Sequence, residues 1–273
     1  MEKDSPMGSL FRRQFSAIAL SILLSLMILI GFPARAEAMK ALKAIAFDPG
    51  ATAVNVAAIY ETTPTTQKST MKSLKSTNKA LKKAPGFAGS AMLQGDDGTR
   101  FIVLSQWQDL ASYQAAIATP TAESSKETNT EKATAIAPSR TVVFEISKAQ
   151  TAREGLVPAV KGKQAVVEFS EFKLKAPEDQ AKIVASAEKL IPATLLKQPA
   201  PQSVVLLNST DSTDVALMAN WNCTADFAEG EKPAAFDALD AEVAALVDVD
   251  EHLYNVVGIM PAEVKKPKES EES

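Results

Sequence analysis

One β-hairpin pattern occurs twice in this sequence. Residues 86–107 and residues 202–221 each consist of an apolar run, a polar turn and a second apolar run that ends in tryptophan. When Trp107 is placed on Trp221, the two segments align without a gap and their turns coincide. Two apolar runs around a short turn are typical of a hairpin. The repeat therefore predicts two copies of one small domain in tandem.

The first 38 residues have the features of an export signal. A pair of arginines precedes an uncharged apolar run over residues 17–32, and small residues follow it. This order predicts a signal peptide over residues 1–38, cleaved after Ala36 or Ala38. The run is shorter than the roughly 20 residues of a membrane span, so an uncleaved anchor is the alternative. The arginine pair leaves both general secretion and twin-arginine export open. We expect an exported protein of the periplasm or cell envelope, or of the thylakoid lumen.

Composition excludes several classes of function. The formal net charge is −4, whereas a general nucleic-acid binder would be basic. The sequence holds one cysteine, Cys223, and one histidine, His252. It can therefore form no internal disulfide, and it cannot supply a cysteine–histidine zinc site or a histidine-ligated haem in each copy. No cofactor, metal ion or nucleic acid is expected as a partner.

The first copy is predicted over residues 51–150. Its expected elements, in order, are a strand over 53–61, a helix over 66–83, the hairpin, a short helix over 108–118 and a strand over 141–147. Residues 119–139 are rich in Thr, Ser, Glu, Lys, Ala and Pro, which indicates a flexible surface insertion.

The second copy, predicted over residues 164–262, repeats this order. Its expected elements are a strand over 164–174, a helix over 178–196, the hairpin, a helical region over 222–246 and a strand over 253–259; a disordered tail over 263–273 follows. Strand–helix–strand–strand–helix–strand is the split βαβ pattern of ferredoxin-like α+β domains. One sheet face is covered by helices and the other needs a cover. We therefore expect two tandem ferredoxin-like domains that close into one α+β barrel within a monomeric chain.

The motifs around the hairpins resemble the antibiotic biosynthesis monooxygenase family. In the first copy the resemblance is carried by Pro85, Gly86, Phe87, Asp97, Gly98, Trp107 and Tyr113. In the second it is carried by Trp221, Phe227 and residues 252–257. The resemblance implies domains that pair sheet to sheet into a dimeric α+β barrel, which a tandem chain could form by itself.

The same resemblance implies a function and a site. Members oxidise phenolic or quinol-like molecules without metal or flavin, in a pocket between sheet and helices. Trp107 and Tyr113 match pocket residues of the family, and Asn55 on the predicted first strand is the third candidate. Related members degrade haem with an Asn, a Trp and a helical His. Asn55 and Trp107 are present here, but the helix after Trp107 has no histidine, so haem degradation is not expected.

Each candidate also has a structural explanation. Trp107 could simply cap a core, and Tyr113 could be half-buried with its hydroxyl in water. Asn55 could face outward, although a buried amide would need partners. His252 is expected in a solvated position. The polar strand partners of the family's site are not clearly matched. A non-catalytic small-molecule-binding or interaction module of the cell envelope therefore stays open as the alternative function.

The helix predicted over residues 66–83 has a row of positive charges. Lys72, Lys75, Lys79 and Lys82 follow one another at three- and four-residue steps and share a face. A solvated helix face is the simple interpretation. The alternative is a weak contact with an anionic membrane surface, to which each lysine would contribute about 1 kcal/mol.

Overall fold

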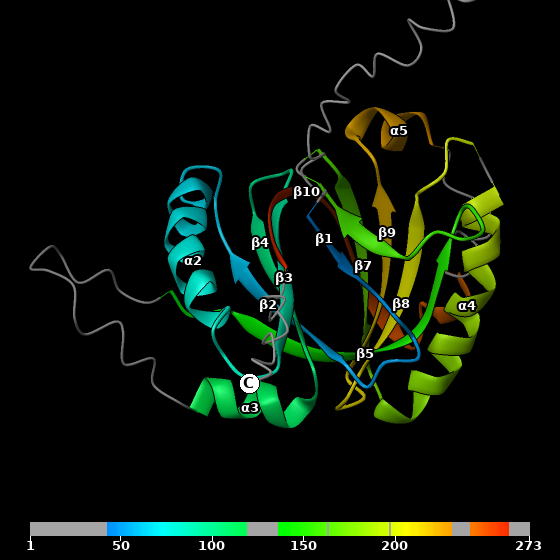
Figure 1. Ribbon diagram of the computed structural model, residues 1–273. Coiled ribbons are helices and arrows are strands. Elements are labelled where there is room, and N and C mark those ends of the chain that lie inside the picture. Colours follow the sequence, from blue (N-terminus) through cyan, green and yellow to red (C-terminus); the bar gives the residue numbers. More distant parts are fainter. Residues whose placement is uncertain (1–42, 119–135, 163, 197, 231–240, 262–273) are drawn as a thin grey trace, which may run out of the picture. The chain divides into compact units, whose positions relative to one another are not determined.

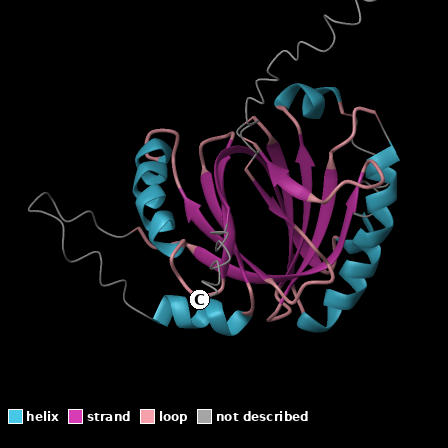
Figure 2. Ribbon diagram, in the orientation of Figure 1, coloured by secondary structure: helices cyan, strands magenta, loops and turns pink. Residues whose placement is uncertain are grey.

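The computed structural model describes residues 43–118, 136–162, 164–196, 198–230 and 241–261. The predicted signal peptide and C-terminal tail lie outside these ranges, as do residues 119–135 of the predicted insertion. The described chain folds around a closed barrel of eight antiparallel strands with helices on its outside (Figures 1 and 2). No described helix has the length and apolar content needed to cross a membrane.

The barrel consists of two halves with the same order of elements. The N-terminal half contains β2 (Val54–Glu61), α2 (Gln67–Leu81), β3 (Phe87–Gly95), β4 (Arg100–Trp107), α3 (Leu110–Ala118) and β5 (Arg140–Thr151). The C-terminal half contains β7 (Val166–Leu174), η2 (Pro177–Asp179), α4 (Gln180–Leu196), β8 (Ser203–Ser209), β9 (Asp214–Trp221), α5 (Thr224–Glu229) and β10 (Val247–Pro261). The ferredoxin-like pattern expected from the sequence is confirmed.

Neither half leaves its own sheet edge open. The strand order around the barrel is β10-β3-β4-β2-β5-β8-β9-β7. The last strand of each half therefore pairs with the first hairpin strand of the other half: β5 with β8, and β10 with β3. Each half supplies the partner that the other half's edge lacks, which removes the free edges that invite aggregation. The expected α+β barrel is confirmed, and it closes within one chain.

The two halves share detailed contacts as well as topology. Gln67 begins α2, and its Nε2 donates to the carbonyls of Gly95 and Arg100 at the base of the β3–β4 hairpin, at 2.9 and 3.0 Å. Gln180 begins α4 and donates to the base of the β8–β9 hairpin in the same way, at 2.8 and 3.3 Å. These equivalent glutamines align α2 with α4 residue by residue.

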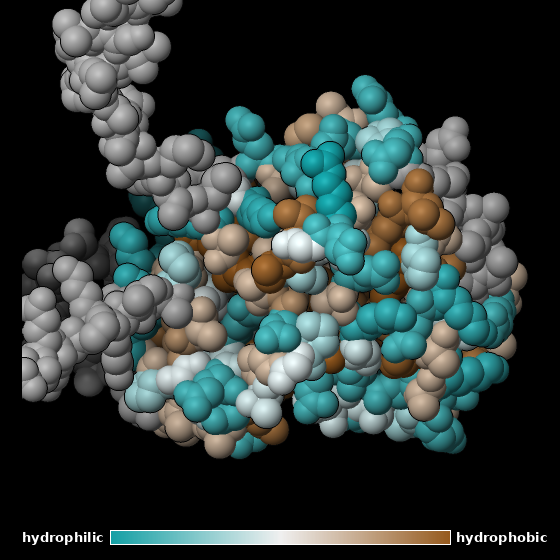
Figure 3. Space-filling view, turned by 45° about the vertical axis from the view of Figure 1, so that its right-hand side comes forward, coloured by the Kyte–Doolittle hydropathy of each residue, from teal (hydrophilic) through white to brown (hydrophobic). Residues whose placement is uncertain are grey.

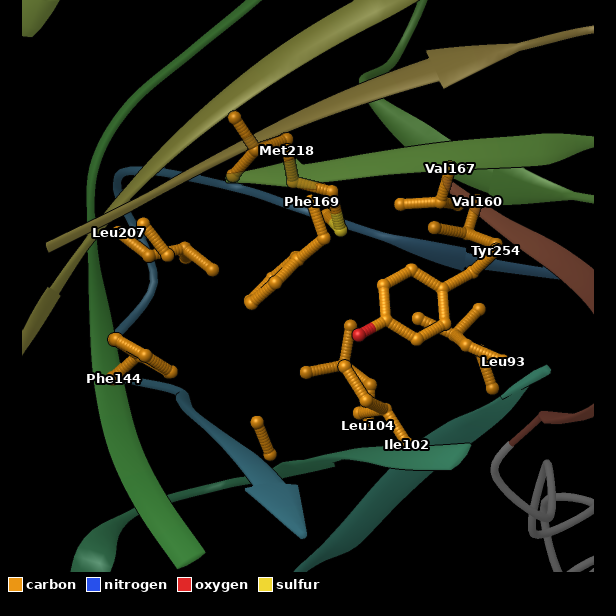
Figure 4. Packing of buried hydrophobic residues seen from close by; sticks show 14 of the residues in the cluster. Leu93, Ile102, Leu104, Phe144, Val160, Val167, Phe169, Leu207, Met218 and Tyr254 are labelled. Atoms are coloured by element: carbon orange, nitrogen blue, oxygen red, sulfur yellow. The ribbon is translucent and has the colours of Figure 1, made fainter. Parts of the chain in front are cut away.

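The barrel interior is an apolar core built by both halves (Figure 4). Phe169 and Tyr254 meet there edge to face, with their ring centroids 6.5 Å apart. A short ribbon, β1 (Ala44–Ala46) paired with β6 (Ala159–Lys161), adds Ile45 and Val160 to this core. Neither strand of this ribbon was expected from the sequence. Around the interior, the inward residues of each strand alternate with residues that face the helices.

The last strands of both halves are longer than predicted. The sequence indicated strands over 141–147 and 253–259, but β5 and β10 extend well beyond these limits. Each of them pairs with its own half along one stretch and with the other half along the next. This pairing between halves, rather than local propensity, sets their length. In the predicted helical region over 222–246, α5 is described, whereas residues 231–240 lie outside the described ranges.

Candidate functional site

A pocket of about 180 Å³ lies between the sheet and the helices of the N-terminal half. Residues of β2, β4, α2 and α3 form most of its wall. Its aromatic and polar lining residues are Tyr60, Thr77, Asn78, Ser105, Trp107, Tyr113 and Thr141. A second hollow, of about 400 Å³ beside β6 and the end of β9, contains none of the three predicted site residues. On the molecular face in Figure 3, polar side chains are interspersed with apolar ones.

Trp107 is both a core residue and a pocket residue. It is 1% exposed. Its ring meets Phe87 edge to face with the ring centroids 5.5 Å apart, and it lies tilted against Tyr113 with the centroids 5.7 Å apart. Its indole Nε1 donates to Ser105 Oγ at 3.0 Å. The indole donor is therefore already satisfied within the protein, and Trp107 offers a ligand an aromatic wall rather than a hydrogen bond.

Two tyrosines, Tyr60 and Tyr113, line the pocket. Burial raises the pKa of Tyr60, and the neighbouring Tyr113 raises it further. Burial also raises the pKa of Tyr113. Both hydroxyls therefore stay protonated at neutral pH and can donate a hydrogen bond to an oxygen of a ligand. Tyr113 was expected from the sequence, whereas Tyr60 was not. Tyr60 lies four residues after Val56 and therefore on the same face of β2. This two-residue periodicity could have identified it.

Asn55 does not join Trp107 and Tyr113. It is fully buried on the opposite face of β2, where its Oδ1 accepts a hydrogen bond from Gln106 Nε2 at 3.0 Å. Its Nδ2 has no hydrogen-bond partner among the described residues. Successive strand residues point to opposite faces, and Val56 faces the pocket, so Asn55 faces the barrel interior. Of the three predicted site residues, Trp107 and Tyr113 therefore line the pocket, and Asn55 lies on the other face of the sheet.

Asn78 is a buried polar residue that the sequence analysis missed. It is 3% exposed on the inner face of α2, and its Oδ1 accepts a hydrogen bond from Ser90 Oγ at 3.0 Å. Asn78 stands four residues after Leu74, at helical spacing. Its spacing from Leu74 was the available signal. The buried face of α2 otherwise holds the polar residues Gln67 and Thr70, so apolar periodicity does not mark it.

At the equivalent positions of the C-terminal half, the described side chains are apolar and buried. There α4 places Leu190 and Ile191 where α2 places Thr77 and Asn78, as the alignment of the two helix-starting glutamines shows. Both residues belong to a buried apolar cluster that also contains Trp221. The Nε1 of Trp221 has no hydrogen-bond partner among the described residues. Polar lining residues in the first half thus correspond to larger or fully apolar residues in the second.

Ionisable metal ligands do not gather at this pocket. In the described ranges, no three His, Cys, Asp or Glu side chains are arranged to hold a metal ion. The residues lining the pocket include no carboxylate and no histidine. The single cysteine, Cys223, is half-buried before α5 and does not line the pocket. The chemistry available to the pocket is therefore aromatic packing, neutral hydroxyls and one amide.

Comparison with known proteins confirms the resemblance noted in the sequence. The model of the antibiotic biosynthesis monooxygenase family matches residues 53–127, which include β2, α2, the β3–β4 hairpin and α3. A search of curated protein sequences finds no match. Among solved structures, the chain is similar to an anthrone oxidase-like protein, with 15% identity, a TM-score of 0.64, and coverage of 82% of this chain and 98% of that chain.

A second similar structure is a proposed monooxygenase from Fusobacterium nucleatum subsp. nucleatum. It shares 12% identity at a TM-score of 0.52, over 80% of this chain and 99% of that chain. At these identities the likeness shows the fold. Both comparisons extend over most of the described barrel, whereas the family match is confined to the half that contains the pocket.

Proposed function

We propose that the pocket of the N-terminal half binds a small aromatic or quinol-like molecule and oxygenates it without metal or flavin. The observation that carries the proposal is the contrast between the halves. The family-matched half has a pocket with an aromatic wall and polar side chains in its lining, whereas the equivalent described positions of the other half carry buried apolar side chains. The known fold neighbours, an anthrone oxidase-like protein and a proposed monooxygenase, support an oxidative role.

The size of the pocket restricts the ligand. An apolar cavity of about 150 Å³ accepts benzene, and the pocket here measures about 180 Å³. It therefore fits one substituted ring without rearrangement. A tricyclic anthrone exceeds this volume and would extend past Tyr113 or Ile117, which lie on α3 at the edge of the pocket. We expect monocyclic hydroquinones to be better substrates than anthrone.

In the proposed reaction the substrate supplies the electrons. A hydroquinone ring gives one electron to O₂, the resulting pair recombines at a ring carbon, and loss of water leaves a hydroxyquinone. One hydroquinone and one O₂ thus yield one hydroxyquinone and one water. Tyr60 and Tyr113 would donate hydrogen bonds to the substrate oxygen and stabilise its phenolate form. Trp107 and the apolar lining would hold the ring and exclude water.

Oxygen uptake with monocyclic hydroquinones tests this proposal. We expect Tyr113→Phe to reduce kcat/KM by about tenfold or more, because a hydrogen bond to a charged oxygen contributes about 1.5–3 kcal/mol. Phe227→Leu, a change beside Trp221 in the C-terminal half, is the matched control and should leave the rate of oxygen uptake unchanged. Equal rates for the wild type and Tyr113→Phe would place the chemistry elsewhere.

The alternative function is binding without catalysis. It is favoured by one observation: the pocket lining contains no group that would be a base at neutral pH, because the pKa of both tyrosines is raised. Hydroquinone binding that quenches tryptophan fluorescence, together with no oxygen uptake above the uncatalysed rate, would establish this alternative.

We also propose that the protein is exported and that α2 contacts an anionic membrane surface. Lys72, Lys75 and Lys79 are exposed along α2, and Lys82 is partly buried. Reversing the charge at two positions, with Lys72→Glu and Lys79→Glu, should weaken binding to anionic phospholipid vesicles by about tenfold or more. Each lysine near such a surface contributes about 1 kcal/mol. The measurement is co-sedimentation at low salt.

The exposed pair Lys182 and Lys189 on α4 offers a matched control. Reversing both to Glu changes the net charge equally, so an equal loss of vesicle binding would show that total charge, rather than the α2 face, is responsible.

A further inference from the structure

One end of the barrel carries a cluster of charged residues from both halves. The N-terminal half contributes Arg100 and Arg140, the first residues of β4 and β5. Arg100 Nη1 lies 2.6 Å from Asp250 Oδ2, and Arg140 Nη1 lies 2.7 Å from Asp214 Oδ1. Arg140 also pairs with Glu171, whose side chain is 2% exposed. Every one of these ion pairs joins one half to the other.

Neighbouring groups complete the cluster. Lys173 Nζ lies 3.0 Å from Asp250 Oδ2. His252 does not lie in the solvated position expected from the sequence: Nε2 lies 2.9 Å from Asp250 Oδ1, and Nδ1 lies 3.2 Å from Asp97 Oδ2 in the other half. Burial alone would raise the pKa of Asp250, but hydrogen bonds from Arg100 and Lys173 lower it to about 2. The carboxylate is therefore held in its charged form.

The two arginine–aspartate bridges are the same contact made twice. Arg100 and Asp214 begin the third strand of their halves, and both precede the strand-ending tryptophan by the same spacing. Arg140 is paired with Ile59 on β2, and Asp250 is paired with the equivalent residue Glu171 on β7. The third-strand position of each half thus meets the last-strand position of the other. Both positions hold Arg in the N-terminal half and Asp in the C-terminal half.

This distribution of charge distinguishes unlike from like pairing. A barrel of two N-terminal halves would place Arg100 against Arg140 at both contacts. A barrel of two C-terminal halves would place Asp214 against Asp250 at both, with a buried Glu171 beside each. The five side chains are between 2 and 33% exposed. Repulsion between largely buried like charges is poorly screened by solvent and salt.

We propose that these reciprocal arginine–aspartate pairs determine which halves close the barrel. The N-terminal half is complementary to the C-terminal half and repels a second N-terminal half, and the C-terminal half behaves likewise. The surface at this end of the barrel thus selects the unlike half as its partner and disfavours barrels built from like halves of two chains. Specificity of this kind requires a penalty against the wrong partner as well as an attraction to the right one.

A charge-reversal cycle in the full chain tests the proposal by thermal unfolding. Arg100→Asp with Arg140→Asp leaves Lys173 and His252 as the non-acidic members of the cluster, and we expect Tm to fall by about 10 °C or more. Asp214→Arg with Asp250→Arg should have a similar effect. The fourfold exchange restores complementarity with reversed signs and should recover at least half of either loss. Glu171 has no charged counterpart at Ile59, so the recovery is expected to be partial.

The control is Lys75→Asp with Lys79→Asp, which changes the net charge equally on the exposed face of α2. This control should shift Tm by no more than about 2 °C. A decrease of Tm in the fourfold variant that equals the sum of the decreases in the two double variants would overturn the proposal. Double variants with the same Tm as the wild type would overturn it as well.

Co-expression of the two double variants measures partner choice directly. In the first variant both halves are acidic at these positions, and in the second both are basic. Complementary barrels then require halves from different chains, so native mass spectrometry should detect mixed dimers well above the statistical 1:2:1 proportion of random pairing. A mixture in which mixed dimers do not exceed the statistical proportion would show that the charges do not select the partner.

Discussion

A triple variant that introduces apolar residues of the C-terminal half at and beside the pocket should lose about 100-fold in affinity for a hydroquinone. The changes are Thr77→Leu, Asn78→Ile and Ser90→Val, each taken from the equivalent position of the C-terminal half. A ligand entering this variant would have to displace packed apolar side chains, which costs about 1–3 kcal/mol. Because Asn78 and Ser90 bond to each other, replacing both leaves neither unpaired and should be nearly neutral for stability.

Titration of 1,4-hydroquinone against tryptophan fluorescence measures the loss, and thermal unfolding shows that the variant is folded. Ser76→Leu, which adds a leucine on the exposed side of α2, is the control for an added apolar side chain. Unchanged affinity in a folded triple variant would show that the ligand site lies outside this pocket, whatever the reaction is.

Truncating either strand-ending tryptophan should destabilise the protein strongly, and truncating Trp107 alone should abolish the function of the pocket. Trp107 is 1% exposed and Trp221 is 7% exposed, and each packs against a phenylalanine. Removal of such an aromatic side chain costs about 3–5 kcal/mol, which lowers Tm by about 10 °C in a chain of this size. Trp107→Ala should also lose oxygen uptake because the aromatic wall is gone.

Trp107→Phe separates the two effects, since it retains a ring while losing the bond to Ser105. It should keep most of the stability and part of the activity. Trp107→Ala is compared with Trp221→Ala under conditions in which the same fraction of each variant is folded. Trp221→Ala should retain the oxygen uptake per folded molecule. Equal losses of specific activity in Trp107→Ala and Trp221→Ala would indicate a general loss of packing instead of a role in the pocket.

The elements with strong local signals were predictable from the sequence. The hairpins, their terminal tryptophans and the helices after β2 and β7 follow from periodicity and turn residues, and the closure of the barrel follows from two apolar sheet faces that need cover. The lengths of β5 and β10 were not predictable. Their outer segments pair with the other half, and such pairing has no local signature.

Part of the pocket lining was predictable from the sequence. Trp107 and Tyr113 do line one pocket, whereas Asn55 lies on the far side of β2. In a strand, an error of one residue changes the face, and a single apolar run such as β2 does not reveal which face it presents to the helices. Tyr60 was missed because it stands in a largely apolar strand, and Asn78 because the buried face of α2 is mostly polar and has no apolar pattern that would mark it. The comparison with Phe172 and Ile191, the apolar residues at the equivalent positions of the C-terminal half, indicates their role.

The exchange of edge strands between halves has a consequence for how such a protein can change. In a symmetric homodimer every substitution occurs twice, at two equivalent places, so both sites must tolerate it. In this chain the equivalent positions are encoded separately, and the covalent connection keeps the two halves at an effective concentration on the order of millimolar. One half is therefore free to specialise in ligand contact while the other becomes scaffold, without either having to remain self-complementary.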